Sequence, residues 1–198
     1  SIRKNKVFSL INLTGLTVGL TCCLLIALYI RHELSYDQFH VNGDRIGRVI
    51  MEYKIGDEGR AGNFTSTKVF QEFKRQFPEI ESGVRMTRVS RLIKYDDKVF
   101  DEKRFLYADS TLFKVFSFEL LNGSPHEVLK APKTLVLTKS AAKKYFGTTD
   151  PLGKILKIGS EGTDYQVTGV MEDIPSNSQL NFDMVASFSS LGPAQEET

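Results

Sequence analysis

A long uncharged stretch near the start of the chain constrains its fold more than any other feature. Residues 7–30 contain no Asp, Glu, Lys or Arg, and three basic residues, Arg3, Lys4 and Lys6, precede them. At about 1.5 Å per residue, a helix of this length extends about 36 Å, enough to cross the hydrocarbon core of a bilayer. The stretch therefore predicts a membrane-spanning helix.

The charges at its two ends predict how this helix is oriented. Basic residues favour the cytoplasmic side, so we expect a cytoplasmic N-terminus in the cell inner membrane and an extracytoplasmic position for the residues after Arg31. A cleavable signal peptide is the competing interpretation, but its apolar core usually has about 7–15 residues and ends in a small-residue cleavage site. Here the stretch runs directly into LYIRHE. We expect residues 1–31 to form a retained anchor, and residues 32–198 to form a periplasmic domain that is incomplete at its C-terminus.

The rest of the chain has the composition of a folded domain without disulfides. Residues 31–198 number 168, enough for a domain with its own core. Of the 26 basic residues, 23 lie in this part together with all 24 acidic ones. This balance argues against nucleic acid as a partner, because binding it needs an excess of Lys and Arg. Both cysteines, Cys22 and Cys23, lie in the apolar stretch, so the domain has no disulfide framework.

Small residues recur on one face of the expected membrane helix. Asn12, Gly15 and Gly19 are three and four residues apart, so they share a face. The GxxxG pattern from Gly15 to Gly19 lets another helix approach closely, and Asn12 can form a hydrogen bond across such a contact. We predict that this face packs on another helix; a helix that contacts only lipid is the alternative.

Short apolar runs separated by turn residues predict an α+β domain after the membrane helix. We expect strands at 46–53, 92–95, 98–100, 104–107, 135–137, 155–158, 165–171 and 182–188, with a long hairpin turn at 56–62 and a tight turn at Asp96-Asp97. Three helices are expected, together with a brief turn of helix that Ser124-Pro125 opens. One covers 67–77, is capped by Ser66 or Thr67, and has a core-facing stripe of Val69, Phe70, Phe73 and Phe77. A short one near 112–116 is capped by Asp109 or Ser110. The third covers 140–146, is capped by Thr138 and ends at Gly147.

The residue patterns of common catalytic and metal sites are missing. The three histidines are His32, His40 and His126. A zinc-protease pattern that begins at His32 would need a second histidine at position 36, where Tyr36 stands. The glycine-rich stretch 56–62 lacks the Gly-Lys-Ser/Thr ending of a phosphate-binding loop. We therefore expect neither an enzyme activity nor a cofactor or metal site; a membrane-anchored hydrolase would need a nucleophile–base pair that the sequence does not offer.

Four stretches resemble a known family in the family's own order. They are NKVFSLIN at 5–12 with ELSYDQFH at 33–40; NGDRIGRV at 42–49; LVLT at 135–138 with KKYFG at 143–147 and DPLGK at 150–154; and VTGV at 167–170 with DIP at 173–175. Together they resemble the MacB-like periplasmic core domain of FtsX-like ABC transporter permeases. Two positions depart from the family: Gly47 replaces a frequent aromatic residue and Gln179 a frequent histidine. We expect altered local packing at both.

The resemblance implies a permease subunit of an ABC-type exporter or mechanotransmission system. It implies further membrane helices after residue 198, a separate or fused ABC ATPase, a second permease copy in a dimer, surrounding membrane lipid and a periplasmic partner protein. The same resemblance assigns Glu33, Tyr36, Asp37, Phe39 and His40 to a transmission joint, where motion of the membrane helix enters the external domain. A proline at Tyr36 is expected to break helix continuity and uncouple ATP hydrolysis from transport.

A single-pass, membrane-anchored sensor or ligand-binding module is the alternative function. Such a protein would carry a second span or a signalling module after residue 198. Three further apolar spans there would instead favour the permease.

Overall fold

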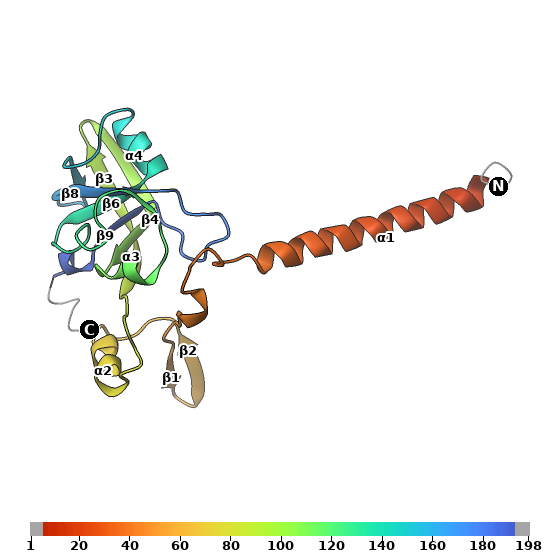
Figure 1. Cartoon of the computed structure of the whole chain (residues 1–198), viewed down its shortest axis with the longest axis horizontal. Helices are drawn as coiled ribbons and strands as arrows, with labels where there is room; N and C mark the ends of the chain where they lie inside the picture. Colours follow the sequence, from red (N-terminus) through yellow and green to blue (C-terminus); the bar gives the residue numbers. More distant parts are fainter. Residues whose placement is uncertain (1–5, 193–198) are drawn as a thin grey trace. The chain divides into compact units, whose positions relative to one another are not determined.

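Residues 6–192 are described by the computed structural model of the chain (Figure 1). They divide into two units. One consists of residues 6–38 and 177–179, and the other of residues 39–176 and 180–192. The first unit contains helix α1 (Lys6–Glu33), and the second contains the strands. Both α-helices and β-strands are present in an irregular order, so the α+β prediction is confirmed.

Helix α1 has the length and the surface expected of a membrane span. Its 28 residues include no buried side chain. Within residues 6–192 it is the one helix long and apolar enough to cross a membrane, with a hydropathy of 2.1. The Thr17 hydroxyl donates to the Leu13 carbonyl at 2.7 Å and the Thr21 hydroxyl to the Thr17 carbonyl at 2.8 Å. These polar groups are therefore satisfied within the helix, as a hydrocarbon environment requires.

The second unit is built on a seven-stranded sheet that closes on itself. Its strands are β3 (Met86–Tyr95), β4 (Lys98–Ala108), β5 (Leu120–Asn122), β6 (Thr134–Thr138), β7 (Ile155–Ile158), β8 (Thr163–Met171) and β9 (Met184–Ser187). Their order is β5-β8-β6-β9-β4-β3-β7, and β7 also pairs with β8. Six strands thus form a closed ring and β5 extends it at β8. The β4–β9 and β6–β8 pairs are parallel, and the other pairs are antiparallel.

Alternating side chains from all six ring strands form the main core. Phe105 and Tyr107 of β4 alternate with outward residues, and the other five strands contribute in the same way. Since side chains alternate between the two faces of a strand, the cluster that all six share lies inside the ring. The outward face forms a second cluster: Leu106, Ala108, Leu112, Phe118, Val128, Leu129, Val136, Met171, Phe182 and Val185.

Two helices lie against these clusters and can be followed in Figure 1. Helix α4 (Lys139–Phe146) contributes Ala141, Ala142, Tyr145 and Phe146 to the inner core. It begins and ends as expected, because the Thr138 hydroxyl accepts a hydrogen bond from the Ala141 N–H and Gly147 has φ +64° at the C-cap. Helix α3 (Leu112–Val115) packs Leu112 into the outer cluster. Its N-cap is Thr111 without a side-chain cap bond, so the predicted caps Asp109 and Ser110 are wrong.

A β-bulge in the pairing of β3 with β4 interrupts the regular alternation of buried and exposed side chains along β4. Val89 pairs with Phe105 and Arg91 with Glu102, so Lys103 and Arg104 together face the single residue Ser90. The extra residue lets Glu102 and Phe105 both be buried, although they are three positions apart. Such bulges reset the alternation of side chains along a strand. This explains why residues 98–100 and 104–107, predicted as separate strands, belong to one.

Residues 43–62, which precede β3 in the second unit, differ most from the prediction. Residues 43–45 form the short 3₁₀ helix η1 (Gly43–Arg45), and the strand expected at 46–53 is β1 (Met51–Ile55). It pairs with β2 (Glu58–Gly62) through a turn of two residues, Gly56 and Asp57, so the long turn predicted at 56–62 is wrong. A second 3₁₀ helix, η2 (Phe188–Ser190), follows β9, which is shorter than predicted.

Helix α2 (Val69–Gln76) forms where expected but is not a core helix. Its N-cap is Lys68, without the side-chain cap predicted from Ser66 or Thr67. No residue of α2 is buried, and Phe73 and Phe77 are 37% and 49% exposed. The apolar stripe predicted helix formation correctly. The prediction that this stripe faces the core is wrong. Among the described residues, Phe70 packs closely against Gly83, while Phe73 and Phe77 stay partly exposed.

Candidate functional site

The candidate site begins where the membrane helix ends. We call residues 33–40 the exit segment. Helix α1 ends at Glu33, which is exposed, and residues 34–39 form successive turns. The ring of Tyr36 meets the ring of His32 edge-on, with 5.3 Å between centroids. The helix thus ends before Tyr36, and a proline at that position would alter a turn without interrupting a helix.

Asp37 binds a loop that lies 140 positions further along the chain. Its carboxylate oxygen Oδ1 accepts hydrogen bonds from the Ser178 hydroxyl at 2.9 Å and from the Gln179 N–H at 3.1 Å. The Asp37 N–H in turn donates to the Asn177 carbonyl at 2.9 Å. Asp37 has φ +56°, a left-handed conformation that Asp and Asn tolerate better than most residues,. This backbone geometry turns its side chain and its N–H to the same loop.

Asn177 adds a second set of hydrogen bonds to the same contact. Its side-chain Nδ2 donates to the Ser35 carbonyl at 2.8 Å and to the Ser35 hydroxyl at 3.1 Å. Ser178 is buried and Asn177 half-buried. Residues 35–37 and 177–179 are therefore joined through both backbone and side chains, within one unit of the molecule.

The last two residues of the exit segment, Phe39 and His40, belong to the second unit. His40 is buried, and its Nδ1 accepts a hydrogen bond from the Ser117 N–H at 3.1 Å. Its ring lies edge-on to the rings of Phe116 and Phe118, with 5.2 Å between centroids in each case. Phe39 packs on Phe118 at 6.1 Å. The chain is thus fixed in an aromatic pocket three residues after Asp37.

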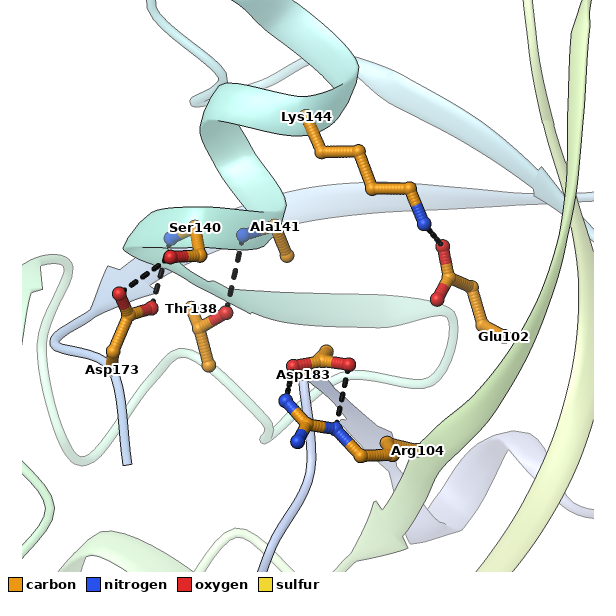
Figure 2. A network of polar contacts seen from close by, with 8 residues as sticks. All are labelled: Glu102, Arg104, Thr138, Ser140, Ala141, Lys144, Asp173 and Asp183. Carbon is orange, nitrogen blue, oxygen red and sulfur yellow. Dashed lines mark hydrogen bonds and ion pairs between the residues drawn. The ribbon is translucent and has the colours of Figure 1, made fainter. Parts of the chain in front are cut away.

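The loop that Asp37 contacts is itself fixed at both ends. We call residues 172–183 the return loop, because they connect β8 to β9. At its first end, the Asp173 carboxylate accepts hydrogen bonds from the Ser140 N–H at 2.9 Å and the Ser140 hydroxyl at 2.6 Å, at the start of α4. Figure 2 shows Asp173, Thr138 and Ser140 together at this helix end. Two of the stretches that resemble the family, 135–147 and 167–175, meet here.

The charge of Asp173 is stabilised at this position. Partial burial by itself raises the pKa of the Asp173 carboxyl, but the two hydrogen bonds from Ser140 outweigh burial and bring the pKa below its ordinary value. Hydrogen bonds to the ionised form and the positive end of a helix both have this effect. Asp173 is therefore a carboxylate at neutral pH and caps α4 as an anion.

At its other end the return loop is fixed to two strands. The Arg104 guanidinium of β4 forms a two-pronged ion pair with Asp183, seen in Figure 2, and its hydrogen bonds to Asp183 raise the pKa of Arg104. The Asp183 N–H donates to the Arg104 carbonyl at 2.8 Å, and the Asp183 carbonyl accepts from the Thr138 N–H at 2.9 Å. Asp183 lies directly before β9, so this end of the loop is attached to β4 and β6 as well.

A buried carboxylate connects β4 to α4 nearby. Glu102 accepts a hydrogen bond from the Tyr145 hydroxyl at 2.6 Å and forms an ion pair with Lys144, also drawn in Figure 2. Burial and the bond to Glu102 raise the pKa of Tyr145, which stays protonated. Strand β4, whose Arg104 binds Asp183, is thereby also attached to helix α4, whose Ser140 binds Asp173.

The predicted helix-packing residues lie along one exposed face of α1. Asn12, Gly15 and Gly19 are exposed, and a Cβ placed at either glycine meets no atom within 4 Å. Among residues 6–192, Asn12 forms no side-chain hydrogen bond. The surface is open to another helix, and its role as a packing face stays a prediction.

The structure adds residues that the sequence did not single out. Asn177 and Ser178 contact the exit segment, and Ser117 binds His40. Gln179 drew attention through its side chain, yet it contributes its backbone N–H, and its side chain is exposed. A loop serine or asparagine carries no sequence signal for such a distant partner. Within the described residues there is also no group of three His, Cys, Asp or Glu side chains placed to hold a metal ion.

The described residues thus combine one helix long and apolar enough to cross a membrane with an α+β domain built on a closed sheet. Residues 9–198 match the family model of the MacB-like periplasmic core domain. The chain belongs to this family, which comprises periplasmic domains of ABC-type transporter permeases and not catalytic enzymes. It therefore derives from a family of inner-membrane transporters.

Three solved structures resemble the chain. A permease-protein domain from Porphyromonas gingivalis has 25% identity and a TM-score of 0.57, over 65% of this chain and 59% of that domain. The extracellular domain of the ABC-type transporter YknZ from Gram-positive bacteria has 25% identity and a TM-score of 0.44, over 55% of each chain. The periplasmic region of MacB from Actinobacillus actinomycetemcomitans has 21% identity and a TM-score of 0.42, over 55% of this chain and 49% of that one.

The match to each of these structures spans less than two thirds of its length. A comparison with curated proteins found no match.

Proposed function

We propose that this chain is the first membrane helix and the periplasmic domain of an ABC-type exporter permease, and that the exit segment passes motion from the one to the other. Residues 1–31 cross the inner membrane with the N-terminus in the cytoplasm, and residues 32–198 lie in the periplasm. The basic residues before α1 and the absence of charge within it support this orientation,. ATP is hydrolysed by a separate ATPase subunit or domain.

The double attachment of the exit segment carries this proposal. Asp37 is bound to the return loop, and His40 is bound in the aromatic pocket. The return loop continues through Asp183, which pairs with Arg104, into β9. Movement of the helix end is therefore transmitted along two routes, through the chain to His40 and through hydrogen bonds to β9. Rigid secondary elements and hydrogen-bond networks of this kind carry energetic coupling between distant sites.

The Asn12–Gly15–Gly19 face supports the membrane part of the proposal. Helices in lipid associate through small residues and interhelical hydrogen bonds. A second permease copy, or another helix of the same permease, would place its backbone against Gly15 and Gly19 and a polar group near Asn12. ATP-driven rearrangement of these helices would then move α1 and act on a periplasmic partner protein or cargo.

The proposal is tested by following the external domain without knowledge of its cargo. The full-length permease is reconstituted with its ATPase in lipid nanodiscs, with Cys22 and Cys23 replaced by alanine and one cysteine introduced at the exposed Lys98. Spin labels at this position in two permease copies report their separation. We expect a nonhydrolysable ATP analogue to change this separation in the otherwise unaltered protein. A separation that ignores the nucleotide contradicts the proposal.

Two substitutions of Asp37 isolate the proposed contact. Asp37→Gly keeps the left-handed backbone but removes the acceptor for Ser178 and Gln179. It is expected to abolish most of the nucleotide-dependent change while ATP hydrolysis continues. Asp37→Asn keeps both the backbone preference and an oxygen acceptor, and is expected to retain the change. Equal behaviour of the two variants would remove the contact from the mechanism.

A further inference from the structure

A cleft opens at one end of the strand ring. None of its lining residues belongs to the exit segment or to residues 177–179. Its volume is about 420 Å³, and its lining includes Arg91, Tyr107, Ile158, Glu161, Tyr165 and Ser190. The turn between β7 and β8, the end of β4 and the residues after β9 meet here. Ligand sites commonly have volumes of about 300–1,000 Å³ and occur in the mouths of β-barrels.

Arg91 brings a positive charge to this cleft that the protein does not neutralise by direct contact. Among residues 6–192 its guanidinium forms no ion pair, whereas Arg85 pairs with Asp109 and Arg104 with Asp183. Its protein contacts are long or weak. Nε lies 3.5 Å from the Tyr107 hydroxyl, Nη1 lies 3.4 Å from the Ser90 carbonyl, and Cζ lies 5.5 Å from the Tyr107 ring centroid. A half-buried guanidinium retains most of its five donors for a ligand.

Two tyrosines beneath Arg91 supply a further donor. The hydroxyls of Tyr107 and Tyr165 are 3.3 Å apart, and both side chains are at most 5% exposed. Burial raises the pKa of Tyr165 and keeps this phenol protonated. The pair has two hydroxyl protons, and the bond between the tyrosines uses one. No carboxylate or carbonyl of the described residues accepts the other. The Ser190 hydroxyl, which also lines the cleft, is a hydrogen-bond partner of Tyr165, so this group of hydroxyls can donate into the cleft.

We propose that the cleft binds an organic carboxylate, with the Arg91 guanidinium pairing with the carboxylate and the tyrosine pair donating a hydrogen bond to it. The planar fork of arginine matches a carboxylate with two parallel hydrogen bonds.

A carboxylate fits this cleft better than a phosphate. One guanidinium balances the single charge of a carboxylate, and a phosphate dianion would need a second cation. The cleft instead carries the exposed carboxylate of Glu161 at its lining, which repels a doubly charged ligand more strongly than a singly charged one,. Both a free small acid and the C-terminal carboxylate of a peptide have the required chemistry.

Binding is measured by calorimetry with the full-length permease in lipid nanodiscs. The first probe is 3-phenylpropionate, and its matched control is the neutral amide 3-phenylpropanamide. We expect the acid to bind at least tenfold more tightly than the amide, since the two differ only in the group that Arg91 contacts. Equal affinities, or no binding of the acid up to millimolar concentration, would overturn the proposal. Acetyl-leucyl-phenylalanine and its C-terminal amide form a second pair, and a dipeptide acid that binds more tightly than 3-phenylpropionate identifies a peptide as the source.

Matched arginine variants assign the binding to the cleft. Arg91→Gln is expected to weaken acid binding at least tenfold. Arg88→Gln, which removes the same charge from an exposed residue of the same strand, is expected to leave it unchanged. Arg91→Lys, with charge but no fork, should give an intermediate loss, and thermal unfolding confirms that each variant is folded. Glu161→Gln is expected to tighten binding two- to threefold. Similar losses in Arg91→Gln and Arg88→Gln would show a nonspecific charge effect and refute the site.

Discussion

His40 shows how one side chain can join two segments by shape and by hydrogen bonding at once. Its ring fills a pocket between Phe116 and Phe118, and its Nδ1 accepts the Ser117 N–H. Since that N–H is a donor, Nδ1 carries no proton in this arrangement, and the imidazole is held as the Nε2–H tautomer. The pocket therefore fits both the shape of the His40 ring and its hydrogen-bond acceptor.

Replacing His40 by phenylalanine separates these two contributions. His40→Phe keeps an aromatic ring of similar size and leaves the Ser117 N–H without its acceptor. An unsatisfied buried donor costs about 1–3 kcal/mol, so we expect a loss of stability of this order. His126→Phe is the control, because His126 is exposed and should change stability little. Thermal unfolding of the full chain checks both variants, and a stable His40→Phe protein would show that packing alone retains the exit segment.

At the level of residues, the sequence singled out some members of the candidate site, and their role as a transmission joint stays a prediction. The family resemblance selected Asp37, Phe39 and His40, whose contacts with distant segments the structure now describes. It could not indicate their partners. Asn177 and Ser178 act through a contact that depends on how the chain returns, and Gln179 acts through a backbone group that every residue except proline carries.

Helix α4 shows at the scale of an element how charge and capping fix a connection. Asp173 lies at its start, and its carboxyl pKa lies below the ordinary value of 3.8 because the Ser140 bonds outweigh the effect of burial. A carboxyl whose pKa is lower in the folded state stabilises that state above its unfolded pKa, and the contribution is lost as the pH falls through the folded pKa. The helix end should therefore weaken only in acid.

Asp173→Asn tests this pH dependence. At neutral pH the variant should be less stable by a few tenths to about 1 kcal/mol, the usual value of an exposed anion at a helix N-terminus. The difference should persist down to about pH 4 and then shrink as the wild-type carboxylate is protonated. Unfolding measured between pH 7 and pH 3 checks this. A difference that stays constant with pH would assign the effect to the side-chain shape and not to its charge.

Strand β8 has a glycine, Gly169, at a position where neighbouring atoms leave no room for a side chain. A Cβ at Gly169 would lie 2.9 Å from Val128 Cγ1 and 3.0 Å from the Asn122 carbonyl. The extra residue of β8 at Thr168, between the pairs Leu135–Val167 and Val136–Gly169, brings these neighbours close. The VTGV stretch thus combines a bulge with a glycine that permits close packing of β5.

Gly169→Ala should therefore destabilise the domain by roughly 1–3 kcal/mol, as overpacking does in a dense core. Gly47→Ala is the control, since Gly47 is exposed and a Cβ there meets nothing within 4 Å. Chemical unfolding should show a lower midpoint for the first variant and no loss for the second. An unchanged midpoint for Gly169→Ala would mean that β5 moves away at little cost.

At the scale of elements, the sequence predicted correctly those features that depend on interactions between neighbouring residues. The cap at Thr138, the helix end at Gly147 and the tight turn at Asp96-Asp97 were predicted correctly. The caps of α2 and α3 were wrong, because Ser66, Asp109 and Ser110 do not occupy the cap positions. Asp109 instead pairs with Arg85, at 2.8 Å between Oδ1 and Nη2, which a reading of neighbouring residues cannot reveal.

The proposed membrane topology rests on the charges around α1 and is testable in cells. A single cysteine at Lys98, in a protein whose Cys22 and Cys23 are alanine, should react with a membrane-impermeant maleimide in intact spheroplasts. A cysteine at Lys4 should react only after the membrane is permeabilised. Both expectations follow from the positive-inside rule. Labelling of position 4 but not of position 98 in intact spheroplasts would reverse the orientation and remove the basis of the transport proposal.

At this scale the sequence predicted the class of fold but not the closure of its sheet. Hydrophobic alternation located most strands, yet the parallel pairs β4–β9 and β6–β8 join segments separated by whole elements. Such pairings are decided by how the complete set of strands buries its shared core, and no local pattern encodes them.

The parallel contact of β9 with β4 also affects how the domain bears a load. The return loop enters β9 at its N-terminal end, and β9 lies between β4 and β6. A pull along this strand is directed along both ladders, so their hydrogen bonds are strained together in shear and do not open one after another. A strand in this position is hard to pull out of the sheet. We therefore expect a force on the return loop to move the whole domain before it unfolds the sheet.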